Sequence, residues 1–377
     1  MTKLFPGKTN SRLLVIYCSV VPHNFPPHHR LEFVKQLSRH LNVIFFDLPS
    51  NFRRSSLLGI VGFYGFLVRT FVRFNYSFVW EYFPVKRINS LTLLIYLLLQ
   101  KLLLKKKIIL FTTSAYFDSI YSMIPYDVSI FDCPDRHAGE FEKNKDWVEG
   151  FDLVFTNTNL LSKTLKEYNN NVRLIPSGYA PAREAVYFHQ KIPDSVLFLG
   201  GISQRIDYDL LNKVIRALPD VHFYFMGEIY LNKYYAERKD KVRLRKWQKI
   251  LSNPNIHYLE NLSTNLFKLA PLFRVGIIPY LKNDVFNNNS NPIKLYEYLA
   301  NGMYIVSTAL VNVSNVSKGL PIYTATSARE FADKIRLLLL KPEKDISRYK
   351  VRVDKLLRDQ SMEKKTRIVL REIKLVS

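Results

Sequence analysis

Lys294 and Glu297 lie three residues apart in a predicted helix over residues 292–301. Asn291 is a good N-cap and Pro292 fits the first helical position, so the free amides and positive dipole at that end would attract an anion. A first-turn lysine opposes the dipole unless a bound diphosphate is shared between the amides and Lys294. Glu297, on the same face, could accept two hydrogen bonds from a ribose diol. The alternative is an i,i+3 ion pair on a solvated helix face.

Four side chains that could take part in acid–base chemistry lie at the end of a predicted strand over residues 128–133: Asp132, Asp135, Arg136 and His137. A carboxylate or an imidazole at a strand end can serve as a general base. The alternative is capping of the strand end together with a local Asp–Arg pair. The sequence alone leaves both interpretations open.

Two adjacent glycines, Gly200 and Gly201, follow another predicted strand at residues 195–199. Without a Cβ they let the backbone approach a phosphate, although ordinary tight turns also use them. Arg205, just beyond, could neutralise the charge of a diphosphate or could be a loop arginine that faces solvent.

The elements that would position these residues follow from the sequence pattern, in which short apolar runs alternate with helix-like stretches. Such alternation indicates parallel sheet covered on both faces. The pattern breaks over residues 177–192, which we interpret as an interdomain linker. Before it, the predicted strands are 13–19, 42–47, 107–111, 128–133 and 153–156, and the predicted helices are 31–40, 115–123 and 158–168.

A second series of strands and helices follows the linker. Its last helix opens with a predicted capping box formed by Ser327 and Glu330. Two consecutive open α/β domains bind ligands outside the carboxyl ends of their strands. The predicted strands are 195–199, 221–226, 255–258, 275–279 and 304–307, and the predicted helices are 207–218, 292–301 and 327–340.

Composition narrows the class of protein. A length of 377 residues suggests about two domains, and 47% hydrophobic with 23% charged content excludes wholesale disorder. The net charge of +23 predicts an anionic partner: nucleic acid, an anionic membrane face or phosphorylated substrates. The two cysteines, Cys18 and Cys133, form no disulfide framework and suit a reducing cytosol.

The P-x-K-x-x-E-Y-L-A-x-G pattern over residues 292–302 resembles the donor-site helix of GT-B glycosyltransferases, especially those similar to glycosyltransferase family 4. Residues 197–203 resemble the glycine loop that opens their carboxy-terminal domain. Residues 255–260 resemble the strand and loop where the nucleotide base docks, and residues 275–280 resemble the strand before the donor loop. The resemblance is closest over about residues 195–310.

This resemblance implies an α/β protein with two Rossmann-like domains facing a cleft. Residues 1–180 would bind the acceptor, residues 193–345 would bind a nucleotide-sugar, and residues 346–377 would form a helix crossing back to the first domain. No metal and no cofactor is expected, since the helix dipole, Lys294 and Arg205 can stabilise the charge of the leaving diphosphate. The implied donor-binding residues are Gly200, Gly201, Arg205, Tyr258, Asn291, Pro292, Lys294 and Glu297.

On the acceptor side, the resemblance implies a loop over residues 21–30 that contacts the acceptor through His28, His29 and Arg30. A loop stiffened by prolines with surface histidines is the alternative. Residues 132–135 form a D-x-x-D segment that resembles a segment of the family at the cleft. Asp135 is the preferred candidate for the general base, and Asp132 and His137 are the other candidates. Asn289 stands where many family members have a glutamate that holds the donor sugar, so the sugar and the stereochemistry of transfer stay open.

Residues 51–110 hold ten Lys and Arg side chains and one acid, Glu81, among aromatic and aliphatic runs. This pattern favours an interfacial helix on anionic lipid, with a core helix and a basic rim as the alternative. The apolar stretches at 55–68 and 88–100 are shorter than the roughly 20 residues of a membrane span, and no signal peptide is expected.

The function expected from this sequence is transfer of a sugar from a nucleotide-sugar, with UDP as the favoured nucleotide. The acceptor would be a lipid-linked or growing cell-surface glycan at the cytoplasmic face of the membrane. A non-catalytic GT-B subunit and a nucleotide-sugar epimerase are the rival interpretations. A nucleic-acid-binding protein is favoured by charge alone, but the sequence shows no module of that kind.

Overall fold

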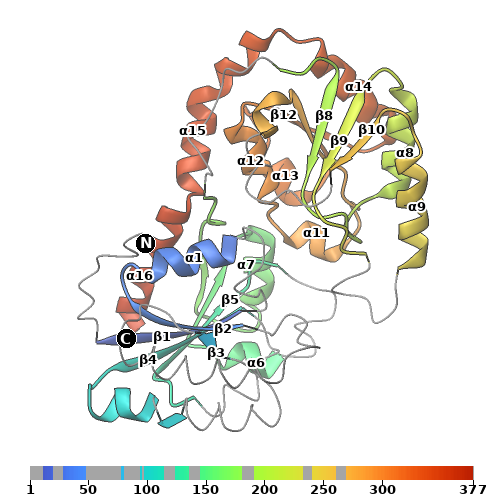
Figure 1. Cartoon of the computed structure of the whole chain (residues 1–377). Helices are drawn as coiled ribbons and strands as arrows, with labels where there is room; N and C mark the ends of the chain where they lie inside the picture. The colour runs from blue at the N-terminus through green and yellow to red at the C-terminus, as the bar shows by residue number, and fades with distance from the viewer. Residues whose placement is uncertain are drawn as a thin grey trace, which may run out of the picture. The chain divides into compact units, whose positions relative to one another are not determined.

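The computed structural model describes residues 12–19, 29–47, 78–79, 94–95, 97–113, 124–135, 145–180, 191–231, 240–259 and 269–376. The chain divides into two compact units (Figure 1). Unit 1 comprises Met1–Pro134, Gly139–Ala180 and Ser361–Ser377, and unit 2 comprises Asp135–Ala138 and Pro181–Gln360.

Unit 1 contains a seven-stranded parallel sheet in the order β3-β2-β1-β4-β5-β6-β7. The five predicted strands are all present, and their boundaries agree with the prediction to within one residue. The two outermost strands, β3 and β7, are short and were not predicted. The strands are β1 Leu13–Ser19, β2 Asn42–Asp47, β3 Phe78–Val79, β4 Lys107–Thr112, β5 Val128–Asp132, β6 Leu153–Thr156 and β7 Val172–Leu174.

The main core of unit 1 lies between the sheet and two helices, α1 (His29–Leu37) and α16 (Met362–Val376). Tyr17 of the central strand β1 is fully buried there and stacks on Phe111, with ring centroids 5.0 Å apart. The described residues of unit 1 before the linker also include the helices α6 (Lys145–Glu149) and α7 (Asn159–Leu165) and helical residues at 94–95 and 97–102. The helix predicted at 115–123 lies outside the described residues.

The carboxy-terminal segment of the chain forms two helices and not the single one expected over residues 346–377. The first, α15 (Lys350–Asp359), belongs to unit 2, and α16 belongs to unit 1. The break lies at Ser361, whose hydroxyl accepts a hydrogen bond from the amide of Lys364 and so caps the next helix. The amide of Met362 donates to the carbonyl of Tyr179 over 2.7 Å, which joins α16 to the end of the amino-terminal part of unit 1.

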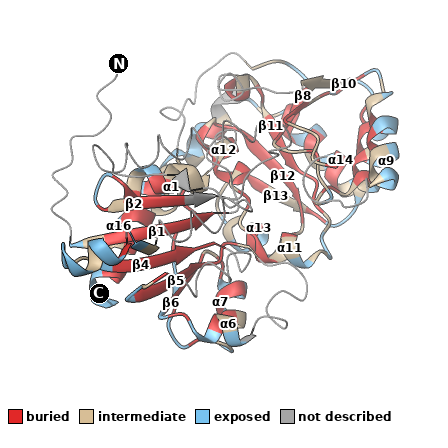
Figure 2. Ribbon diagram, turned by 60° about the horizontal axis from the view of Figure 1, so that its bottom comes forward, coloured by how far each residue is buried: buried red, intermediate tan, exposed pale blue. Residues whose placement is uncertain are grey.

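Unit 2 contains a six-stranded parallel sheet in the order β10-β9-β8-β11-β12-β13. The five predicted strands are confirmed, and β13 was not predicted. The inner strands of both sheets are coloured mostly as buried in Figure 2, as expected for parallel sheets with continuous apolar strands, whereas the edge strand β10 is intermediate along its whole length. The strands are β8 Ser195–Leu199, β9 His222–Met226, β10 Ile256–Leu259, β11 Val275–Ile278, β12 Tyr304–Thr308 and β13 Ile322–Ala325.

The three helices predicted in unit 2 are present as α8 (Tyr208–Ala217), α12 (Lys294–Ala300) and α14 (Ala328–Leu339). The capping box at α14 is only half as predicted: Ser327 accepts from the amide of Glu330, but the carboxylate of Glu330 accepts from the amide of Thr326. The remaining described elements are α9 Lys241–Leu251, η2 Ala270–Leu272, α11 Val285–Asn289, α13 Val311–Val316 and η3 Glu343–Tyr349.

Both sheets have the strand order of a Rossmann fold, in which the chain moves outward from a central strand and then continues on its other side. The order reverses between β1 and β4 in unit 1 and between β8 and β11 in unit 2. Ligands of open α/β sheets bind outside the carboxyl ends of the strands at such a point. Within the described residues, no helix has the length and apolar character that a membrane span requires.

Candidate functional site

The reversal point of unit 2 brings together the loop after β8, the loop after β11 and the start of α12. Lys294 lies there with its side chain buried, 8% exposed, and its Nζ has no hydrogen-bond partner among the described residues. The Nζ is 3.8 Å from the centroid of the Phe198 ring and 4.7 Å from that of Tyr280. The predicted alternative of a solvated Lys294–Glu297 ion pair is therefore wrong.

Glycines let the two loops beside Lys294 approach each other. Gly200 has φ +120°, and a Cβ at this position would lie 3.3 Å from the Nζ of Lys294. Gly227 has φ +146°, and a Cβ there would lie 2.4 Å from the carbonyl oxygen of Gly200. A Cβ on Gly201 would lie 2.1 Å from the ring of Tyr230. A side chain at Gly227 would collide with backbone, and one at Gly200 would press on the lysine in a strained backbone conformation, so glycine leaves the Gly200 backbone open toward Lys294.

Tyr298 fixes α12 over the sheet. Its hydroxyl accepts a hydrogen bond from the amide of Leu199 over 2.8 Å and donates one to the carbonyl of Ile277. A Cβ on Gly276 would lie 2.6 Å from the Tyr298 ring, so only glycine leaves room for it in β11. The helix that carries Lys294 is thus tied to the ends of both strands at the reversal point.

Arg205 supplies a second cation to the site. Its guanidinium donates to the side chains of Asn287, over 2.8 Å, and Ser290, over 2.7 Å, and lies 4.4 Å from the centroid of the Tyr280 ring. Asn287 is fully buried and donates back to the carbonyl of Arg205. Arg205 is thus held by neutral partners, and it is not the solvent-facing loop arginine of the alternative prediction.

The two cations shift the ionisation of their neighbours. Burial alone would raise the pKa of the Tyr280 hydroxyl, but Lys294 and Arg205 hold it below its ordinary value. Burial lowers the pKa of the Lys294 ammonium group, which Tyr280 opposes. Burial also raises the pKa of Glu297 to about 7, against the opposing charge of Lys294. The site therefore combines two basic side chains with a carboxyl group that is only partly ionised at neutral pH.

The start of α12 differs from the prediction. The helix begins at Lys294, its N-cap is Ile293, and no side chain caps it, so the capping role predicted for Asn291 is wrong. A tight turn, in which the Leu295 amide donates to the Pro292 carbonyl, leads into the helix instead. The Asn291 amide group turns away to donate to the hydroxyl of Tyr296 over 2.7 Å. The attraction for an anion therefore rests on side-chain cations and not on a capped helix end.

Tyr258 of β10 lies at the edge of the same loops. Its hydroxyl donates to the carbonyl of Gly227 over 3.0 Å, and its ring packs edge-on against Trp247. Tyr258 is half-buried, so it can support the Gly227 turn and still present a ring edge to a ligand. Glu260, the end of the predicted base-docking segment, lies outside the described residues.

The predicted base segment begins in unit 1, at the end of β5. Asp132 is buried and forms an ion pair with Lys365 of α16, with 3.0 Å between Oδ2 and Nζ. Asp135 follows the strand and is half-exposed, whereas His137 lies outside the described residues. The two carboxylates thus lie in different environments: Asp132 is buried and paired with Lys365, whereas Asp135 is partly exposed.

The predicted acceptor residues lie at the start of α1. The helix begins at His29, two residues before its predicted start, and both His29 and Arg30 are half-buried. His28 lies outside the described residues. Three residues that matter for these sites were not identified from the sequence: Tyr280, Asn287 and Lys365.

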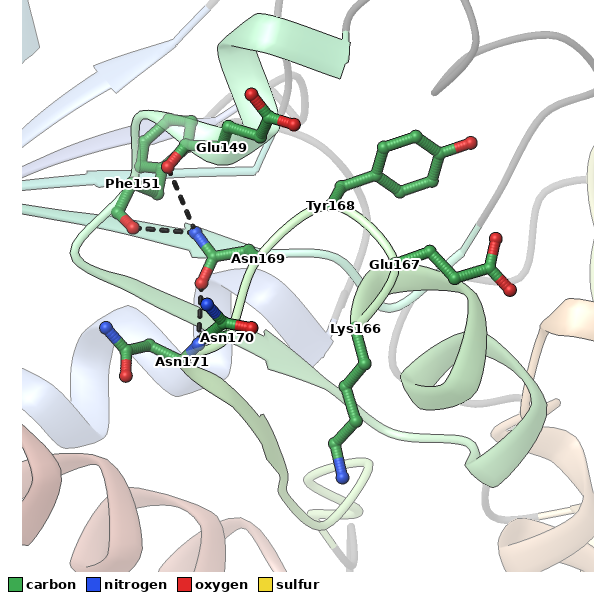
Figure 3. A pocket seen from close by; sticks show the side chains of 8 residues that line it. All are labelled: Glu149, Phe151, Lys166, Glu167, Tyr168, Asn169, Asn170 and Asn171. Carbon is green, nitrogen blue, oxygen red and sulfur yellow. Dashed lines mark hydrogen bonds between the residues drawn. The ribbon is translucent and has the colours of Figure 1, made fainter.

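Figure 3 shows a surface hollow of about 440 Å³ in unit 1. Its lining precedes β6 and β7, so it lies at the amino ends of these strands, opposite the edge where β5 ends at Asp132. Asn169 is committed to backbone there: it donates to the carbonyl of Phe151 over 2.7 Å and accepts from the amide of Asn171. The hollow is therefore formed by a turn that the hydrogen bonds of Asn169 stabilise, and it is not part of the candidate site.

No protein-family profile matches the sequence. Over 133 residues the chain is 27% identical to TuaH of Bacillus subtilis (strain 168), whose name describes it as a candidate glycosyltransferase of teichuronic acid biosynthesis. The match covers 32% of this chain and 28% of TuaH, so the similarity is confined to about a quarter of that protein.

Solved structures resemble nearly the whole chain. The Anabaena protein Alr3699/HepE in complex with UDP-glucose matches with a TM-score of 0.68 at 8% identity, covering 96% of this chain and 99% of that one. A glycosyltransferase from Rickettsia africae matches with a TM-score of 0.65 at 12% identity, covering 97% and 98%. Together with the two Rossmann-like sheets, these matches show that the chain has the GT-B fold of glycosyltransferases.

Proposed function

We propose that the protein is a glycosyltransferase that takes its sugar from a UDP-sugar. The observation that carries this proposal is Lys294, a buried ammonium group without a hydrogen-bond partner among the described residues, which faces the Gly200 backbone at the reversal point of the sheet. An unpaired buried charge is costly, so a bound anion would give it the partner it lacks.

The chemistry of the site fits a nucleoside diphosphate. Lys294 and Arg205 both lie against the ring of Tyr280, whose face attracts positively charged groups. A diphosphate could accept hydrogen bonds from both and could approach the loop backbone, because Gly200 has no side chain. Glu297, one turn along α12, would accept hydrogen bonds from a ribose diol. Complexes of the HepE neighbour with UDP and with UDP-glucose support the choice of nucleotide.

In the proposed reaction, the bond between the sugar and the diphosphate breaks and negative charge grows on the leaving diphosphate. Lys294 and Arg205 stabilise that charge from fixed positions, so the scheme requires no metal ion and no cofactor. Asp135 accepts the proton of the acceptor hydroxyl as the new bond forms. Its partial exposure favours it over Asp132, whose carboxylate is held by Lys365.

We further propose that the acceptor is a lipid-linked or growing cell-surface glycan at the cytoplasmic face of the membrane. The described part of the basic region supports this, since Leu102 and Leu103 are each 72% exposed and Leu104 is 55% exposed. Lys105 and Lys107 follow directly and are also exposed. Exposed aliphatic side chains beside cations have the chemistry needed to attach to anionic lipid.

The test is a screen of UDP-, GDP- and dTDP-sugars for thermal stabilisation and for release of free nucleotide, with and without EDTA. We expect UDP-sugars to stabilise the protein and to release UDP at a rate that EDTA does not change. The Lys294→Met variant should lose both effects, while Lys318→Ala, which removes an exposed lysine of the same unit outside the site loops, should retain them. Interconversion of sugars without release of UDP would instead identify an epimerase, and binding without any reaction would identify a non-catalytic subunit.

A further inference from the structure

A buried charge pair in the described part of unit 1 joins β5 to α16. Lys365 and Asp132 are 233 residues apart in sequence, and each side chain is only 4% exposed. Asp132 is the last residue of β5, and Lys365 lies in the first turn of α16. The proposed base Asp135 follows only three residues after Asp132.

Lys365 also contacts two other segments of unit 1. Its Nζ lies 4.8 Å from the centroid of the Phe33 ring, one turn along α1 from His29 and Arg30. Gly178 has φ +81°, and a Cβ there would lie 2.9 Å from the Cδ of Lys365. One buried lysine therefore contacts the end of β5, the helix α1 and the segment of chain at Gly178, near the end of the amino-terminal part of unit 1.

Stability alone is a poor explanation for this pair. Removing two charges from water costs as much as their attraction returns, and well-packed apolar residues often replace such pairs without loss. An ion pair is more directional than an apolar contact, because the ammonium group must lie within hydrogen-bond distance of one carboxylate. The pair therefore restricts the position of Asp132 at the end of β5, and with it the start of the following loop.

We propose that Lys365 is a positioning residue for the acceptor side of the site. It holds the end of β5, and through it the loop with Asp135, in register with the start of α1. The inference rests on the proposed function for the role of Asp135. It makes the carboxy-terminal helix part of the catalytic apparatus, although none of its residues needs to touch a substrate.

The experiment compares three variants of the full chain. Lys365→Met leaves Asp132 as an unpaired buried charge and is expected to unfold more readily. The double variant Asp132→Leu with Lys365→Met removes both charges together. Arg367→Gln is the matched control, since Arg367 is on the same helix, pairs with Glu363 and is 74% exposed. The measurements are melting temperature, UDP affinity by calorimetry, UDP release from the best UDP-sugar, and hydrogen exchange of residues 29–37 and 128–135.

We expect the double variant to melt close to the wild type and to bind UDP unchanged. Its UDP release should fall about a hundredfold, as expected when a catalytic group is misplaced by about 1 Å. Amides of residues 128–135 should exchange about tenfold faster, because the strand end has lost its anchor. The control should match the wild type in all four measurements.

A double variant with wild-type exchange in both segments would overturn the proposal, because the pair would then be a structural contact only. Wild-type UDP release in a variant with faster exchange would also overturn it. If the wild type releases UDP from no UDP-sugar, the proposed function fails, and the exchange measurement still decides whether Lys365 holds the strand end.

Discussion

The Nζ of Lys294 lies 3.8 Å above the ring of Phe198, the residue two positions before Gly200. The ring gives the ammonium group a partial electrostatic partner, but it accepts no conventional hydrogen bond and provides no counter-charge. The lysine is therefore held ready for an anion at the expense of the free protein's stability. This relationship leads to the first prediction.

Replacing Lys294 by Met should stabilise the free protein and weaken UDP binding. The side-chain stem stays against Phe198 while the unpaired charge is removed, so the free energy of unfolding should rise by about 1–2 kcal/mol. Loss of a charged hydrogen bond should raise the Kd for UDP by about thirtyfold, or about 2 kcal/mol. Urea unfolding and calorimetry measure the two effects. A variant that is less stable and binds UDP normally would show that Lys294 has a structural role only.

Glu297 should make stability depend on pH between about 4.5 and 7. Its pKa is raised to about 7 by burial, so between these values the folded protein binds a proton that the unfolded chain has lost. Stability should therefore fall as pH rises through this range. The difference between the wild type and Glu297→Gln isolates this contribution, and the variant should be relatively more stable above pH 7. A difference that does not change with pH would contradict the raised pKa.

Gly227 should tolerate no side chain. In the Gly227→Ala variant, the Cβ would meet the Gly200 carbonyl at 2.4 Å in a backbone conformation that alanine avoids. We expect a loss of about 2 kcal/mol or more in unfolding free energy and weaker UDP binding, because the Gly200 loop must move. Gly150→Ala is the matched control, since its Cβ would meet its nearest neighbours at 3.6 Å. Equal effects of the two variants would show that the close approach is unimportant.

The basic region should bind anionic liposomes in a salt-sensitive manner. Changing Lys105, Lys106 and Lys107 together to Gln should remove most of this binding, at about 1 kcal/mol per cation near an anionic surface, without changing UDP affinity. Sedimentation with anionic and neutral vesicles measures it. A control triple variant should bind as the wild type does; it changes Lys318, Lys350 and Lys355, which are exposed on unit 2. Equal sedimentation with both vesicle types, or with neither, would contradict an electrostatic attachment.

The strands of both sheets were predictable because they are buried on both faces. Residues 13–19 and 195–199 are continuous apolar runs, and both form strands at the predicted positions. Helix boundaries were less predictable, since they depend on tertiary contacts. The break at Ser361 is an example: Ser361 caps α16 locally, and the amide of Met362 donates to the carbonyl of Tyr179, a contact that no local pattern reveals.

The candidate site was predictable where its residues are close in sequence. Lys294 and Glu297 were identified from one motif, yet the motif suggested an end-capped helix that the structure does not contain. Tyr280 could have been noticed as an aromatic residue directly after a strand end. The support that Asn287 gives to Arg205 spans 82 residues, and no local pattern reveals a contact at that separation.

The return of α16 to unit 1 affects the order in which the protein can fold. During synthesis, all seven strands of the first sheet are available before residues 181–360 are made, but Val369 and Ile373, which are fully buried in the core of unit 1, come after them. Residues 181–360 are contiguous and carry a complete sheet. Unit 2 can therefore complete its folding before unit 1 does. Until residue 373 has been synthesised, the core surface of unit 1 that α16 covers stays exposed and requires protection.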